Sequence, residues 1–142
     1  MIPRFRAWDK KTETIQEIES ISFKEKKLVI DQKSVTWFNS DYIRNFGEVE
    51  LMQSTGLKDK NGVGIFDGDV VLVNVSNGFD HLVNEKTVVQ ESEFHSGLIC
   101  KSLASGMEYR VFKHKKMDYE YEVIGNIYEN PDLLDSDLVE VD

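Results

Sequence analysis

Apolar and polar residues alternate with a period of two along most of this chain, and this alternation limits the fold more than any other feature. The pattern is clear around residues 5–8, 49–53 and 119–123, and short turn-forming segments interrupt it. Side chains of an extended strand point alternately to the two faces of a sheet, so the pattern is typical of half-buried antiparallel strands. No segment keeps a helical period for three turns. The sequence therefore predicts a mainly β fold with many short strands.

Two segments leave room for a short helix. Ile15 and Ile18 lie three residues apart, so residues 14–19 could form a helix instead of a strand. Ser40 or Asp41 could cap a helical turn before the strand that we expect at residue 49.

Residues 51–73 contain the strongest turn signals. Asn61–Gly62 predicts a tight hairpin, because both residues tolerate the positive φ that such a turn requires. Gly68, between two aspartates, predicts a second backbone kink with positive φ. The apolar residues 70–75 follow it and are expected to form a strand in the middle of a sheet. Strand, kink, central strand, turn and strand is the element order of a small SH3-like antiparallel barrel.

The length of 142 residues predicts one domain. Within it we expect an N-terminal β-hairpin extension in residues 1–50, the barrel core in residues 51–130, and a C-terminal turn with an acidic tail in residues 131–142. Asn130 stands before Pro131, and proline is favoured at the first position of a helix. This pair predicts a short C-terminal helical turn.

The formal net charge of −9 argues against binding to duplex DNA, which gains affinity from Lys and Arg that displace counterions. Basic clusters at residues 24–27 and 113–116 are interpreted as solvated hairpin ends. We therefore predict no measurable affinity for random-sequence duplex DNA.

Other bulk features predict a soluble protein of a reducing compartment. The longest apolar runs are far shorter than the roughly 20 residues of a membrane helix. The N-terminus lacks the apolar segment of a secretory signal peptide. A single cysteine, Cys100, excludes an internal disulfide and fits the cytosol.

The sequence offers few residues for catalysis. Asp59, Asn61 and Gly62 resemble part of a calcium-binding loop, but Leu57 and Gly68 then occupy the first and last ligand positions, which excludes an EF-hand. The three histidines have no metal-ligand spacing to one another or to Cys100, which lies in an apolar run and is predicted to be buried and inert. We predict no catalytic residue, no metal site and no cofactor. The alternative is a small metal-dependent hydrolase that uses Asp59, Asp67 and Asp69.

Three blocks of this sequence resemble the YopX family of phage and prophage proteins. They are Pro-Arg-Phe-Arg-Ala-Trp-Asp at residues 3–9, the segment 51–73, and Ile-Gly-Asn-Ile-Tyr-Glu-Asn-Pro-Asp-Leu-Leu at residues 124–134. The chain departs from the family at Ser54, where an aromatic is common, and at Val63 and Gly64, where a charged pair is frequent. The resemblance implies a mostly β, SH3-like architecture, a bacteriophage origin, a location in the host cytoplasm and self-assembly. It implies no catalytic residue.

These observations favour a non-enzymatic, self-assembling module that binds other proteins. Tryptophan, tyrosine and other aromatic residues dominate the binding energy of interfaces, so the candidate contact residues are aromatic: Trp8, Trp37, Phe38 and Tyr42. The alternative for the two tryptophans is a place in the core. A second alternative function is an acidic decoy that occupies a host nucleic-acid-binding protein.

We also predict a homo-oligomer. A partly open barrel exposes unpaired strand edges, and the strands at residues 5–8 and 138–141 are expected to pair with a neighbouring subunit. Because the subunits repel one another through their net charge, this assembly should tighten as salt rises.

Overall fold

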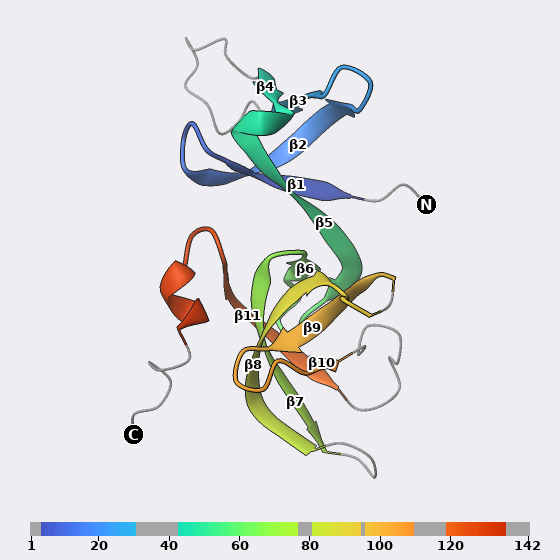
Figure 1. The fold of residues 1–142 in the computed structure, drawn as a ribbon, viewed down its shortest axis with the longest axis vertical. Coiled ribbons are helices and arrows are strands. Elements are labelled where there is room, and N and C mark those ends of the chain that lie inside the picture. Colours follow the sequence, from blue (N-terminus) through green and yellow to red (C-terminus); the bar gives the residue numbers. More distant parts are fainter. Residues whose placement is uncertain (1–3, 31–42, 77–80, 95, 110–118, 136–142) are drawn as a thin grey trace. The chain divides into compact units, whose positions relative to one another are not determined.

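The computed structural model describes residues 4–30, 43–76, 81–94, 96–109 and 119–135. The chain divides into two compact units, Met1–Gln53 and Ser54–Asp142 (Figure 1). The elements are β1 (Phe5–Asp9), β2 (Thr14–Ser22), β3 (Lys27–Ile30), β4 (Ile43–Asn45), η2 (Phe46–Glu48), β5 (Val49–Lys58), β6 (Gly64–Phe66), β7 (Asp69–Ser76), β8 (His81–Glu91), β9 (Leu98–Ser102), β10 (Glu108–Tyr109), β11 (Glu120–Asn126) and η4 (Pro131–Leu134).

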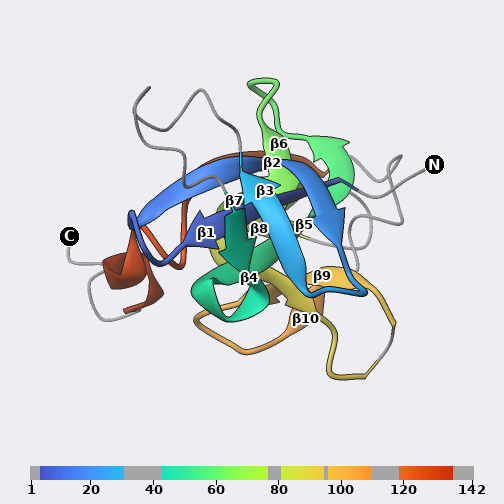
Figure 2. The same cartoon turned by 90° about the horizontal axis from the view of Figure 1, so that it is seen from above.

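The first unit is built on antiparallel strands in the order β4-β3-β2-β1-β5, and Figure 2 shows β3 beside β2. Its core lies on one face of these strands and consists of four buried residues with partly buried neighbours: Ala7, Leu28, Ile30 and Val49. Strand β5 belongs to both units. Its first half pairs with β1, and its second half, in the second unit, pairs with β6.

The structure overturns two expectations for the first unit. Residues 14–22 form strand β2, so the helical alternative for residues 14–19 is wrong. Strand β1 pairs with β2 on one side and with β5 on the other, so residues 5–8 do not form the free edge that we expected to reach a neighbouring subunit. The helical turn suggested at Ser40 or Asp41 lies outside the described residues.

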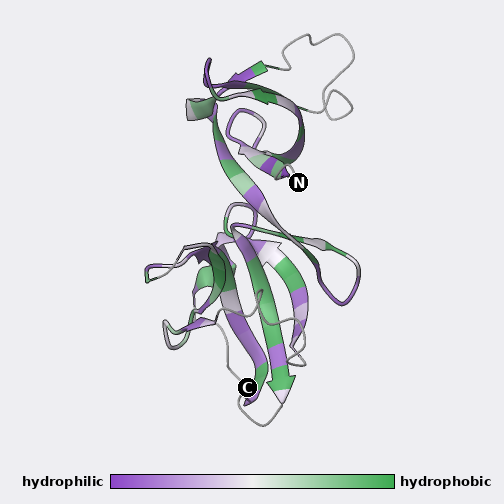
Figure 3. Ribbon diagram, turned by 90° about the vertical axis from the view of Figure 1, so that its right-hand side faces the viewer, coloured by the Kyte–Doolittle hydropathy of each residue, from purple (hydrophilic) through white to green (hydrophobic). Residues whose placement is uncertain are grey.

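The second unit contains a sheet in the order β10-β9-β8-β7-β11, in which every pairing is antiparallel. Strand β7 has a neighbour on both sides, which confirms the predicted central strand. Bands of hydrophobic and hydrophilic residues alternate along the strands (Figure 3). The core contains five fully buried residues: Ile65, Val71, Val73, Val89 and Cys100.

The mainly β prediction is confirmed. The strands of the described ranges form two antiparallel sheets. They do not close into a barrel, because a turn rather than a paired strand covers the outer edge of β11, as shown below. The predicted C-terminal helical turn is present as η4, with Pro131 in its first turn. Within these same ranges no helix is long and apolar enough to span a membrane.

The kink predicted at Gly68 is confirmed, whereas the turn at residues 61–62 is less tight than predicted, because it spans residues 59–63 and Asn61 has no positive φ. Gly62 has a φ of 83° between β5 and β6, and Gly68 has a φ of 91° between β6 and β7. The kink at Gly68 is fixed on both sides, because its N–H donates to the carbonyl of Val89 and its carbonyl accepts the N–H of Ile127.

We expect Gly62→Ala to lower the free energy of unfolding by about 1 kcal/mol, because alanine resists a positive φ. The added Cβ would meet no atom within 4 Å, so backbone strain is the whole effect. Urea titration of the variant measures it. Gly47→Ala is the matched control, since that glycine also has open space around it and no positive φ. Equal loss of stability in both variants would contradict the prediction.

Candidate functional site

Asp59 is the aspartate around which residues 59–63 are built. One carboxylate oxygen, Oδ1, accepts the N–H groups of Asn61 and Val63, each at 2.8 Å. The other, Oδ2, accepts the N–H of Val123 in β11 at 2.9 Å. Beside it, the N–H of Lys60 donates to the carbonyl of Tyr121 at 3.0 Å. This group of contacts, which we call the Asp59 clamp, shapes the turn and covers the outer edge of β11.

The electrostatics of Asp59 fit a structural role. Burial alone raises the pKa of this carboxyl, but the three N–H donors, together with the nearby Lys60, outweigh burial and hold the pKa below its usual value. The carboxylate is therefore ionised at neutral pH, and its two oxygens are already occupied by the backbone. A general base or a metal ligand needs lone pairs that point to a substrate or an ion.

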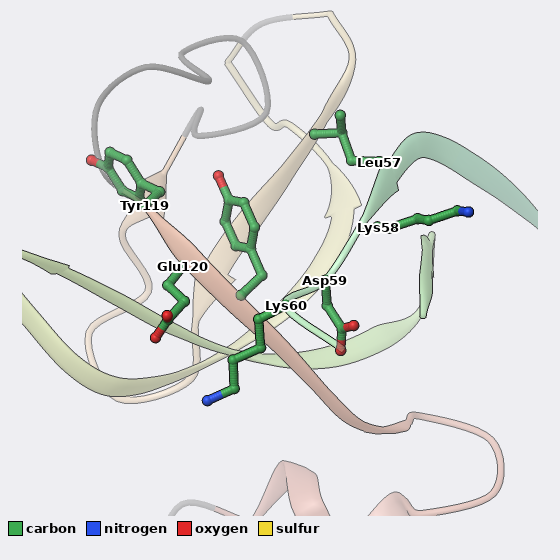
Figure 4. Close-up of a pocket in the computed structure, with 7 residues that line it drawn as sticks. Leu57, Lys58, Asp59, Lys60, Tyr119 and Glu120 are labelled. Carbon is green, nitrogen blue, oxygen red and sulfur yellow. The ribbon is translucent and has the colours of Figure 1, made fainter. Parts of the chain in front are cut away.

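A pocket of about 230 Å³ lies beside the clamp (Figure 4). Its lining residues come from two segments of the second unit: Leu57, Lys58, Asp59 and Lys60 from the end of β5 and the turn, and Tyr119, Glu120 and Tyr121 from β11 and the residue before it. The rings of Tyr119 and Tyr121 are stacked, with centroids 6.4 Å apart. Figure 4 shows the Tyr119 ring and the Glu120 carboxylate pointing in opposite directions from the strand.

The ionisable groups of this pocket are held by burial and by an ion pair. Burial raises the pKa of the Tyr121 hydroxyl well above its usual value, so this group stays protonated. Lys60 forms an ion pair with Glu122 at 3.7 Å. Small-molecule sites usually measure about 300–1,000 Å³, so this pocket suits a single side chain better than a metabolite.

The three aspartates of the hydrolase alternative do not share a site. Asp69 is fully buried and its Oδ2 accepts the N–H of Phe66 at 2.8 Å. Burial and the neighbouring Glu91 raise the pKa of Asp67, which is half-buried in the turn before β7. Among the residues with described positions, no three His, Cys, Asp or Glu side chains are placed to hold one metal ion.

Cys100 is buried, as predicted, and burial raises the pKa of its thiol to about 12. A thiol with this pKa is protonated at neutral pH and is a poor nucleophile. His81 is exposed at the start of β8, and the other two histidines lie outside the described residues.

The structure places one of the four candidate contact residues. Trp8 is half-buried and lies opposite Ile15 and Glu50 on the two neighbouring strands. Its neighbour Ala7 belongs to the buried cluster of the first unit, so Trp8 points to the other face of the sheet. Trp37, Phe38 and Tyr42 lie outside the described residues.

Sequence reasoning missed the buried ion pair of the first unit. Arg44 donates from Nε to Asp9 Oδ1 at 2.9 Å and from a terminal nitrogen to Asp9 Oδ2 at 3.1 Å, and both side chains are at most 2% exposed. Asp9 is the last residue of β1. The signal was its alternation with Phe5 and Ala7, which places the carboxylate on the apolar face, where a charge requires a partner.

Large apolar side chains are exposed in both units. Phe23 is 59% exposed in the first unit, and Phe94 is 76% exposed in the second. Phe23 is held by edge-to-face contacts with Phe5 and Phe46, whose ring centroids lie 6.3 Å and 5.8 Å away. The other exposed residues of this kind include Ile43 and Met107.

Comparisons with known proteins agree with this description. A protein-family model described as YopX protein matches residues 4–135. The chain is also similar to the crystal structure of protein EF1440 from Enterococcus faecalis, with 27% sequence identity and a TM-score of 0.60. That likeness covers 95% of this chain and 99% of the other. No curated protein matches the chain.

Proposed function

This chain belongs to the YopX family, and from that premise we propose that it is a non-enzymatic module that binds other polypeptide chains, its own included. The observation that carries the proposal is the exposure of Phe23 beside the rings of Phe5 and Phe46, since exposed aromatics grouped with other apolar residues mark interaction sites. The pocket beside the Asp59 clamp supports it, because its size suits one side chain of a partner.

The family further supports a bacteriophage or prophage origin and a place in the host cytoplasm, which we include in the proposal. An SH3-like arrangement of residues 51–130 is part of it as well.

The hydrolase alternative has little support in this geometry, and a thermal-shift measurement tests it. A metal that binds only the native state must raise the melting temperature. Because Asp59 and Asp69 already accept backbone N–H groups, we expect no shift with Mg²⁺, Mn²⁺ or Ca²⁺ relative to chelator. A rise of several degrees that is lost in Asp67→Asn would contradict the prediction.

Light scattering coupled to size exclusion tests self-association directly. The proposal expects a mass above that of one 16.4-kDa chain, increasing with protein concentration. A single-chain mass at every concentration would remove self-binding from the proposed function. Affinity capture from host lysate followed by mass spectrometry then tests for a different protein partner.

The acidic-decoy alternative is favoured by the distribution of charge. Residues 1–53 contain nine basic and nine acidic side chains, whereas residues 54–142 contain eight basic and seventeen acidic ones. The whole net charge therefore belongs to the second unit. A decoy would bind a basic nucleic-acid-binding protein through this unit, and the affinity would fall steeply as salt rises.

A further inference from the structure

The end of the first unit near the turn between β2 and β3 combines an exposed aromatic ring with positive charge. We call this surface the Phe23 patch; it consists of Phe23 and four exposed basic residues, Arg4, Lys24, Lys26 and Lys27. The ring of Phe23 makes edge-to-face contacts with Phe5 and Phe46, so a partner would not have to order it.

The basic groups of the patch are available. None of the four has an ion-pair partner among the described residues, and the one acidic residue in the turn is Glu25. The first unit as a whole is neutral, so this end is a local positive surface on a chain that is otherwise acidic. A binding partner should therefore present apolar and acidic side chains together.

Residues 131–142 of this same chain have that composition. They contain five acidic residues and no basic one, and the acids alternate with apolar residues: Leu133, Leu134, Leu138, Val139 and Val141. In the described part, Asp132, Leu134 and Asp135 are exposed on η4 and at its end. We propose that the Phe23 patch of one chain binds residues 131–142 of a second copy.

This inference rests on the proposed self-association and names the two surfaces that meet. The contact joins two different surfaces. A copy that binds a neighbour through its Phe23 patch still has its residues 131–142 free for another copy, so chains or rings of subunits result. An acidic, apolar segment suits the patch better than single-stranded nucleic acid, which binds through rows of stacking aromatics. Pairing of strand edges was expected to tighten as salt rises. The contact proposed here should instead weaken as salt rises, because salt screens the attraction between the lysines and the acidic segment.

A synthetic peptide of residues 131–142, carrying a fluorescent label, tests the contact by anisotropy against the full chain at low protein concentration. We expect saturable binding. The charge reversal Lys24→Glu with Lys26→Glu should weaken it about tenfold, because two exposed ion pairs become two repulsive pairs. Phe23→Ala should weaken it as well, with an unchanged melting temperature as the check on folding. The same variants should lower the mass of the full chain in light scattering.

Two matched variants serve as controls. Lys10→Glu with Lys11→Glu reverses two charges at the other hairpin end of the first unit, and Phe94→Ala removes an aromatic that is even more exposed. Neither should change peptide binding. No peptide binding, or equal loss in test and control variants, would overturn the inference. If the full chain still self-associates in that case, the proposed function survives without it. Binding of a labelled oligothymidylate that Lys24→Glu with Lys26→Glu abolishes, without peptide binding, would assign the patch to nucleic acid instead.

Discussion

Replacing Asp9 by alanine should lower the free energy of unfolding by about 3–5 kcal/mol, since it leaves the Arg44 guanidinium buried without its counter-charge. The carboxylate also accepts the Thr12 hydroxyl at 2.7 Å and the N–H of Lys11 at 3.2 Å, so the turn after β1 loses two contacts at the same time. Urea or guanidinium titration followed by circular dichroism measures the loss.

The control replaces both members of the pair. A buried ion pair often contributes little more than apolar residues of similar volume, so Asp9→Leu with Arg44→Met should be less damaging than Asp9→Ala alone. A double variant as unstable as Asp9→Ala would contradict the argument that an unpaired charge causes the loss.

The same pair predicts a pH dependence. Burial raises the pKa of Asp9, but hydrogen bonds from Arg44, Thr12 and Lys11 outweigh it, so the folded pKa lies below the ordinary 3.8. A carboxyl with a lowered folded pKa stabilises the fold above its unfolded pKa and loses this effect as pH falls through the folded value. The stability of the wild type should therefore fall more steeply than that of the double variant below about pH 4.

Replacing Asp59 by alanine should cost about 3 kcal/mol, because three backbone N–H groups lose their acceptor and those that stay buried carry a desolvation cost. Asp59→Asn keeps one carbonyl oxygen and should have an intermediate effect. Hydrogen exchange at Val123 reports the loss locally, since this amide donates to Asp59 across 64 positions of sequence.

Asp67 provides a control, because its pKa is shifted in the opposite direction from that of Asp59. Burial and Glu91 raise its pKa, so its ionised form is unfavourable in the folded chain at neutral pH. Asp67→Asn should leave stability unchanged or raise it slightly. If Asp59→Ala and Asp67→Asn had equal effects, the clamp would not be the cause of the loss.

Local sequence signals were sufficient for the strands and tight turns. Alternation at residues 5–8 and 119–123 predicted β1 and β11, and the positive φ at Gly62 and Gly68 followed from turn chemistry that acts over a few residues. The burial of Cys100 followed from its apolar neighbours.

Contacts between distant segments could not be predicted in the same way. The pairing of Asp9 with Arg44 depends on β4 and β1 facing one core, and no local pattern joins positions 35 residues apart. The placement of β1 between β2 and β5 likewise depends on the whole sheet order, so local alternation at residues 5–8 does not distinguish an edge strand from an inner one. The pocket beside the clamp brings together residues 57–60 and 119–121, whose proximity is a property of the folded sheet.

The Asp59 clamp also has a consequence for the length of the chain. Exposed hairpin tips normally accept inserted residues, because few contacts depend on their spacing. Here one carboxylate contacts the second and the fourth residue after it and a strand far along the chain, so the number of residues from 59 to 63 is fixed by hydrogen bonds. The turn from Leu103 to Met107 is exposed at residues 104–107, and the bond that links it to a distant strand, from the Leu103 N–H to the carbonyl of Lys86, lies before its tip at Ala104. Tags and insertions should therefore be tolerated at Ala104, whereas the turn at residues 59–63 must keep its length to keep the Asp59 clamp.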